Sequence, residues 1–154
     1  VVDWMRTVQL APGADSRLRC ELPHEPLPVL FDAEHLRRVL VNLLDNAHRH
    51  ASAQPGAIFL RLAARDESWA QLSVLSDGAP IAPEVERHLF EPFFSTRSRG
   101  TGLGLYICRE LCERYGASIE YRARPGAARL RNEFRVTMLR GALGPATATL
   151  GLVP

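Results

Sequence analysis

The sequence contains no lysine, so arginine accounts for all 19 of its basic residues. Any side-chain cation that binds phosphate in this chain is therefore a guanidinium, which can form two parallel hydrogen bonds. Seventeen acidic residues leave a net charge of +2, too small to indicate a polyanionic partner by itself. The sequence also lacks a run of about 18 apolar residues and thus predicts no membrane-spanning helix.

Targeting signals and cysteines are equally scarce. The first residues lack the basic segment and apolar core of a secretory signal, and we expect none. The three cysteines include no C-x-x-C pair and favour reduced thiols in a cytosolic setting. Cys108 and Cys112 lie one helical turn apart, which would suit a metal or a redox pair, but two buried small apolar residues are the better interpretation.

The apolar pattern predicts a single α+β domain, because 154 residues suit one hydrophobic core. The clearest element is a helix over 33–51, capped by Asp32 and apolar at helical spacing. Shorter patterns predict helices over 83–89 and 103–115, and strands over 17–22, 27–32, 57–66, 69–76, 118–124 and 132–139. The mixture of helices and hairpins predicts a two-layer α/β sandwich, with a disordered or peripheral tail.

A glycine-rich turn leads directly into the predicted helix 103–115. The stretch "SRGTGLGLYICREL" places Gly100, Gly102 and Gly104 at the start of this helix. The free N–H groups and the dipole of a helix start attract anions, and glycine lets a phosphate approach the backbone. The turn has neither the Gly-Lys-Ser/Thr ending of a P-loop nor the G-x-G-x-x-G pattern. Alone, it indicates either a phosphate site or a plain turn.

Two asparagines interrupt the leucine pattern of the long helix. Asn42 and Asn46 are four residues apart, so they share one helix face and need polar partners. They could be surface residues that bind water, but an amide oxygen is also a ligand suited to Mg²⁺. Further along, "FEPFFSTRSRG" joins a hydrophobic anchor to Arg97 and Arg99, the pattern of a short lid that closes on phosphate.

These motifs together resemble the ATP-binding catalytic domain of bacterial sensor histidine kinases, in the wider family that includes gyrase, the Hsp90 chaperones and MutL. "NLLDNAHRH" resembles the N box, "SDGAPI" stands at the G1 box, "FEPFF" is similar to the F box and "GTGLGL" to the G2 box. The short lid looks most like the nitrogen-regulation and type IV pilus sensor kinases. The resemblance implies the Bergerat ATP-binding fold, a mixed sheet covered on one face by helices.

The same resemblance divides the chain and implies a site for ATP and Mg²⁺. Residues 15–139 would form the catalytic domain, residues 1–14 a linker or short helix after a dimerisation domain, and residues 140–154 a low-complexity tail. Asn46 would coordinate the Mg²⁺ that bridges the phosphates, with Asn42 and the lid residue Arg97 as further catalytic residues. The nucleotide would also contact Arg49, His50, Ser76, Asp77, Gly78, Gly100, Thr101, Gly102, Leu103 and Gly104.

The G1 box departs from the family pattern D-x-G-x-G. Ser76 stands where an aspartate should bind the adenine amino group, and Pro80 replaces the second glycine. Exchanging a charge-assisted hydrogen bond for a neutral one removes roughly 1–2 kcal/mol, or about five- to thirtyfold in affinity. Pro80 fixes its own φ at about −65° and makes Ala79 extended. Asp77 could replace the carboxylate only with a side chain that starts from the other face.

Two functions therefore stay open. Either this domain binds Mg-ATP and donates the γ-phosphate to a histidine on a separate dimerisation domain, or ATP binding is weak or lost and the domain is a regulatory or interaction module of a sensor protein. Asn42 replaces the Glu of hydrolysing family members, and an amide cannot act as a general base, so hydrolysis by the domain alone should be slow. "HEP" at His24 is predicted to lie in a loop, so it is not a phosphoacceptor motif.

The resemblance also implies partners and a compartment. The partners are the protein's own dimerisation domain and a response regulator, the full-length protein is a homodimer, and the domain is cytoplasmic, as in an inner-membrane sensor. The arginines over 122–140 alternate with apolar residues, which is typical of a sheet with one solvated face. We therefore expect neither nucleic acid nor membrane contact by this domain.

Overall fold

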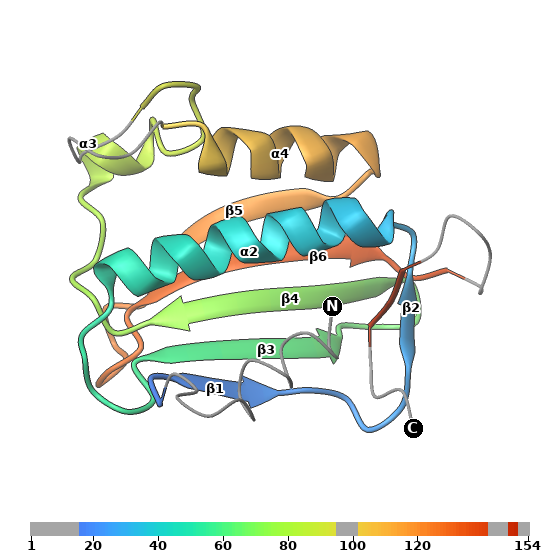
Figure 1. Ribbon diagram of the computed structural model, residues 1–154, viewed down its shortest axis with the longest axis horizontal. Coiled ribbons are helices and arrows are strands. Elements are labelled where there is room, and N and C mark those ends of the chain that lie inside the picture. Colours follow the sequence, from blue (N-terminus) through green and yellow to red (C-terminus); the bar gives the residue numbers. More distant parts are fainter. Residues whose placement is uncertain (1–15, 95–101, 142–147, 151–154) are drawn as a thin grey trace.

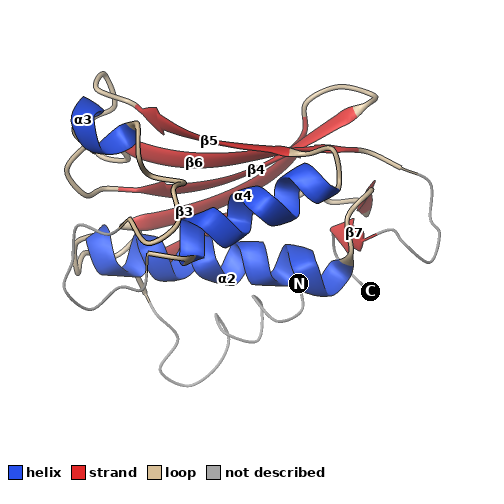
Figure 2. Ribbon diagram, turned by 90° about the horizontal axis from the view of Figure 1, so that it is seen from above, coloured by secondary structure: helices blue, strands red, loops and turns tan. Residues whose placement is uncertain are grey.

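The computed structural model describes residues 16–94, 102–141 and 148–150. In these residues two long helices, α2 (Ala33–His50) and α4 (Gly104–Arg114), lie side by side over one face of a five-stranded sheet (Figure 1; Figure 2). The predicted α+β two-layer sandwich is confirmed. None of the helices in the described ranges is long and apolar enough to cross a membrane.

The sheet contains β1 (Leu18–Glu21), β3 (Ile58–Ala64), β4 (Trp69–Ser76), β5 (Ser118–Ala123) and β6 (Asn132–Leu139). Their order across the sheet is β1-β3-β4-β6-β5. β1 runs parallel to β3, whereas the other three pairs are antiparallel, so the sheet is mixed as expected. The predicted hairpins supply the pairs β3–β4 and β5–β6.

The long helix α2 is capped and packed as its sequence predicts. Oδ1 of Asp32 accepts hydrogen bonds from the backbone N–H groups of Glu34 and His35, both at 3.0 Å, which satisfies two donors of the first turn. The helix buries one apolar stripe against the inward side chains of the strands. Its buried residues are Leu36, Val39, Leu40, Leu43, Leu44 and Ala47.

The carboxyl-terminal tail is more structured than the sequence predicts. β2 (Leu27–Val29) pairs with β7 (Ala148–Leu150) in a separate antiparallel two-stranded sheet. Before β7, the Gly141 N–H donates to the Pro28 carbonyl at 3.2 Å. Strand pairing uses backbone C=O groups and the N–H groups of all residues except proline, so a low-complexity composition did not exclude it.

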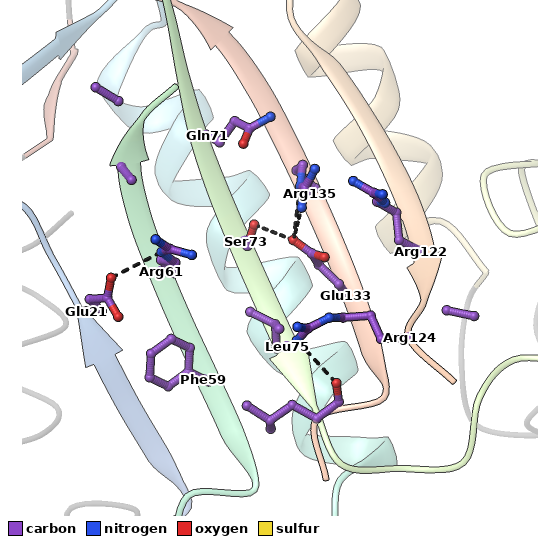
Figure 3. A pocket seen from close by; sticks show the side chains of 14 residues that line it. Glu21, Phe59, Arg61, Gln71, Ser73, Leu75, Arg122, Arg124, Glu133 and Arg135 are labelled. Atoms are coloured by element: carbon purple, nitrogen blue, oxygen red, sulfur yellow. Dashed lines mark hydrogen bonds and ion pairs between the residues drawn. The ribbon is translucent and has the colours of Figure 1, made fainter. Parts of the chain in front are cut away.

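The sheet face opposite the two described helices is polar and carries a shallow hollow of about 480 Å³ (Figure 3). Glu133 is only 5% exposed there; its carboxylate accepts a hydrogen bond from Ser73 Oγ at 2.8 Å and lies 2.9 Å from Nη2 of Arg135. Arg61 pairs with Glu21 at 3.1 Å. This is the solvated, arginine-bearing face that the alternating pattern predicts, and the two helices lie on the opposite side.

Candidate functional site

The predicted motifs gather at one end of the sandwich. Ser76 ends β4 and Asn132 begins β6 at this end, while Gly104 begins α4 beside the carboxyl-terminal half of α2 (Figure 1). The short helix α3 (Pro83–Glu86) lies just beyond them. Tertiary packing thus brings together segments that are far apart in the sequence.

Asn42 meets the start of α4. A Cβ atom built on Gly104 would lie 3.9 Å from Asn42 Oδ1, an ordinary contact distance. Asn42 Nδ2 is buried; no oxygen or nitrogen of a described residue accepts a hydrogen bond from it, and the neighbouring Cys108 sulfur is at most a weak acceptor. The first turn of α4 has neither a side-chain cap nor an acidic residue. The amide donor and the helix N-terminus together fit an anion.

Two buried thiols lie behind Asn42. Cys108 and Cys112 are fully buried, and burial raises the pKa of each thiol to about 12. The Cys108 thiol donates to the Val39 carbonyl at 3.6 Å. Since only a thiolate is a strong nucleophile or metal ligand, both cysteines act as small core residues. This confirms the interpretation based on their one-turn spacing.

Asn46 lies one helical turn beyond Asn42, near the end of α2. It is partly exposed, and its amide forms no hydrogen bond with another described residue. Arg49 and His50 are exposed in the last turn of the helix. A Cβ atom on Gly78 would overlap the His50 carbonyl oxygen, so only glycine allows the loop after β4 to pack against this helix end.

Ser76 and Asp77 point to opposite sides of the sheet. Ser76 is 7% exposed and faces the helices beside its cross-strand partner Asn132. The Asp77 carboxylate accepts hydrogen bonds from the Ser52 N–H at 2.8 Å and from Ser52 Oγ at 2.5 Å, and Arg129 lies 3.8 Å away. Partial burial opposes the effect, but these partners hold the pKa of Asp77 below its usual value. Its carboxylate is therefore engaged with the loop after α2.

Two residues that the sequence did not single out hold the loop after Ser76. The Tyr121 hydroxyl accepts a hydrogen bond from the Ile81 N–H at 2.9 Å and donates one to Asn132 Oδ1 at 2.6 Å. Asn132 Nδ2 donates to the Gly78 carbonyl at 2.7 Å. The one available signal was a polar residue at an inward strand position, where alternation calls for an apolar side chain.

The F box contacts the G2 box through their backbones. Phe93 and Gly102 both have positive φ, at 64° and 70°, and the Phe93 N–H donates to the Gly102 carbonyl at 3.0 Å. A Cβ atom on Gly102 would lie 2.5 Å from the Phe93 carbonyl carbon, so this contact requires glycine. Phe90 is the anchor, packed edge-on against Phe134, while the Phe93 side chain is 77% exposed.

Some predicted residues fall outside the described ranges. They are the lid residues Arg97, Arg99, Gly100 and Thr101, and the predicted linker 1–14. The remaining predicted residues divide into two groups. One group lies on the two helices and the turn before α4, and consists of Asn42, Asn46, Arg49, His50, Gly102, Leu103 and Gly104; the other, Ser76 to Gly78, lies at the end of β4 and in its loop.

Known proteins are similar to this chain in sequence. Residues 31–140 match the family described as histidine kinase-, DNA gyrase B-, and HSP90-like ATPase. The chain is 42% identical over 130 residues to the sensor protein kinase PilS of Pseudomonas aeruginosa, covering 79% of this chain and 24% of PilS. It is 35% identical over 115 residues to the sensory histidine kinase/phosphatase NtrB of Salmonella typhimurium, covering 69% and 31%. The chain thus spans about a quarter to a third of these relatives.

Solved structures share the fold. The mycobacterial sensor histidine kinase MprB aligns with a TM-score of 0.73 and 25% identity, covering 92% of this chain and 93% of that one. The catalytic domain of histidine kinase ThkA aligns with a TM-score of 0.67 and 26% identity, covering 90% and 86%. Full-length ShkA, solved in complex with AMPPNP, aligns at 0.68 and 24% identity over 92% of this chain and 30% of that one, which shows the fold alone.

Proposed function

Since the chain belongs to the family of histidine kinase-, DNA gyrase B-, and HSP90-like ATPases and forms an ATP-binding catalytic domain, we propose that it binds Mg-ATP for transfer of the γ-phosphate to a histidine on a separate dimerisation domain. The observation that carries this proposal is the buried Asn42 donor, which has no oxygen or nitrogen acceptor among the described residues and lies beside a start of α4 that has no side-chain cap. Phosphate oxygens would satisfy both sets of donors.

Asn46 is the residue that would hold Mg²⁺. Its amide oxygen is a hard ligand, and no other described residue engages it. Bound Mg²⁺ would neutralise charge on the phosphate oxygens. Arg49, exposed one turn later, adds a guanidinium on the same end of the helix. We assign the γ-phosphate contact to Arg97, in the lid.

The amide at position 42 favours phosphate transfer over hydrolysis. It cannot remove a proton from water, so it serves only to orient a phosphate through Nδ2. The alternative function, a regulatory module that does not bind ATP, is not favoured. The donors that would bind phosphate are present, and the curated relatives are named as sensor kinases. Hydrolysis by this chain alone should be slow.

The other parts of the reaction belong to the rest of the protein. This chain spans only a part of its relatives, so we propose that the acceptor histidine lies on a dimerisation domain of a homodimer and that a response regulator receives the phosphate. We place the domain in the cytoplasm, where ATP is available. The three free cysteines, Cys20, Cys108 and Cys112, agree with a reducing compartment.

Calorimetric titration with a non-hydrolysable ATP analogue and Mg²⁺ tests the proposal. We expect binding in the micromolar range, weakened about a hundredfold in Asn46→Ala because a charge-assisted contact is lost. The matched control is Asp45→Ala, which changes the adjacent exposed residue of α2 and should bind as the wild type does. A wild-type chain that binds no nucleotide would overturn the proposal.

A further inference from the structure

We propose that Tyr121 and Asn132 are positioning residues for the base end of the nucleotide site. They would lock the loop from Gly78 to Ile81 in the conformation that leaves the Ser76 hydroxyl available to the base. This inference rests on the proposed ATP binding and adds two residues of the sheet to the site. Neither side chain needs to touch the nucleotide.

The loop depends on these two side chains. Among the described residues, the backbone of 78–81 forms no hydrogen bond with another backbone group. Instead, Asn132 Nδ2 donates to the carbonyls of Gly78 at 2.7 Å and Ala79 at 3.3 Å, and the Tyr121 hydroxyl accepts from the Ile81 N–H at 2.9 Å. Both ends of the loop are therefore attached to the β5–β6 hairpin.

The donor and acceptor roles in this chain of hydrogen bonds are fully determined. The Ile81 N–H can only donate, so the Tyr121 hydroxyl accepts from it and gives its own proton to Asn132 Oδ1, 2.6 Å away. The Asn132 NH₂ group then faces the Gly78 carbonyl. Burial raises the pKa of Tyr121 and keeps its hydroxyl protonated at neutral pH. Tyr121 and Asn132 are 7% and 5% exposed, so water cannot easily replace a lost partner.

The placement of Ser76 connects this chain of hydrogen bonds to the base. Ser76 is directly opposite Asn132 in the β4–β6 ladder, and the loop begins two residues after it. Its hydroxyl forms no hydrogen bond with any residue that the structure describes. Both amide atoms of Asn132 are occupied, so Ser76 offers the free polar group at this end. The phosphate donors lie on α2 and α4 and do not contact this chain of hydrogen bonds.

A single hydroxyl deletion tests the inference. Tyr121→Phe keeps the ring, which packs 5.3 Å from that of Phe134, but leaves the Ile81 N–H and Asn132 Oδ1 without a partner. We expect Mg-ATP binding to weaken about tenfold, because a buried donor and a buried acceptor lose their partner. Binding of Mg²⁺ with inorganic tripolyphosphate should not change, because that ligand has no base. Both are measured by calorimetric titration.

The matched control is Tyr115→Phe. The Tyr115 hydroxyl is also partly buried and lies 2.5 Å from His35 Nδ1, but it is at the other end of α4. This variant should bind both ligands as the wild type does. The Ile81 amide should also exchange its hydrogen faster in Tyr121→Phe than in either the wild type or Tyr115→Phe, with no nucleotide present.

Three results would overturn the inference: unchanged ATP binding in Tyr121→Phe, equal weakening of ATP and tripolyphosphate, or an Ile81 amide that exchanges equally fast in all three proteins. A wild-type chain that binds neither ligand would instead refute the proposed ATP binding. The two failures are therefore distinguishable.

Discussion

The two ends of the candidate site differ in how their polar groups are satisfied. At the phosphate end, the buried Asn42 donor has no oxygen or nitrogen acceptor in the described residues, and the start of α4 has no side-chain cap. At the base end, Tyr121 and Asn132 form hydrogen bonds with each other and with the loop, and the Ser76 hydroxyl has no partner among the described residues. Unpaired buried donors indicate where a ligand forms hydrogen bonds, whereas paired groups indicate a part of the site that is already fixed without the ligand.

This difference implies an unequal division of binding energy. Phosphate oxygens would form charge-assisted hydrogen bonds with the Asn42 amide and with the first turn of α4, which has no side-chain cap. The base would meet one neutral hydroxyl in place of a carboxylate. We therefore expect the phosphates to contribute most of the affinity, with a base end that is rigid but weakly attractive.

Substituting one asparagine at each end should have opposite effects on stability. Asn42→Leu removes a buried donor that has no oxygen or nitrogen acceptor among the described residues, and it should raise the free energy of unfolding by about 1–3 kcal/mol while ATP binding is lost. Asn132→Leu deprives the Tyr121 hydroxyl and the Gly78 carbonyl of their partner and should lower it by a similar amount. Urea unfolding without nucleotide measures both. If both substitutions changed the free energy of unfolding in the same direction, the two ends of the site would not differ in how their polar groups are satisfied.

Restoring a carboxylate should reduce the difference between the two ends. Ser76→Asp would offer the base a charge-assisted hydrogen bond and should strengthen ATP binding by about five- to thirtyfold. The control is Ser76→Asn, because asparagine has the size of aspartate but no charge. Its gain in ATP affinity should be much smaller. Titration with ATP and with tripolyphosphate shows where the new carboxylate acts, because only the affinity for ATP, which carries the base, should increase. A gain for both ligands would place the new charge at the phosphates instead.

The smallest expected effect concerns the pH dependence of Asp77. Its folded pKa is lowered, so the stabilisation that its carboxylate provides is present above the unfolded value of about 4 and is lost as pH falls through the folded value. Asp77→Asn should therefore be less stable than the wild type at pH 7, and the difference should disappear in strong acid. Ser52→Ala removes the hydrogen bond from Oγ but keeps the one from the backbone N–H, so it should show the same trend with a smaller amplitude. A difference independent of pH would contradict the assignment.

Much of the scaffold was predictable because its determinants are local. The Asp32 cap, the apolar stripe of α2 and the β3–β4 hairpin follow from neighbouring residues, and all three are confirmed. β7 was not predicted because its partner, β2, lies near the other end of the chain. The two strands pair through backbone groups, which leave no local side-chain pattern. The positive φ of Phe93 was not predictable, because it accompanies a backbone contact with Gly102 in the following motif.

The candidate site also combines features that local sequence determines with features that depend on tertiary contacts. The sequence by itself determined which residues carry the chemistry: the asparagines of α2, the glycines before α4, and Ser76 at the position of the family's aspartate. Residue type and spacing suffice there, because an amide or a glycine has the same donors and the same conformational freedom in any context.

Only the tertiary structure decided which of these polar groups have partners. Tyr121 and Asn132 are joined to Ile81 and Gly78 across long stretches of chain, and the strand register that aligns Asn132 with Ser76 comes from the packing of the whole sheet. Likewise, the contact of α2 with α4 buries Asn42 Nδ2 without supplying an oxygen or nitrogen acceptor from the described residues. Hydrogen-bond satisfaction depends on distances between segments, and folding alone sets those distances.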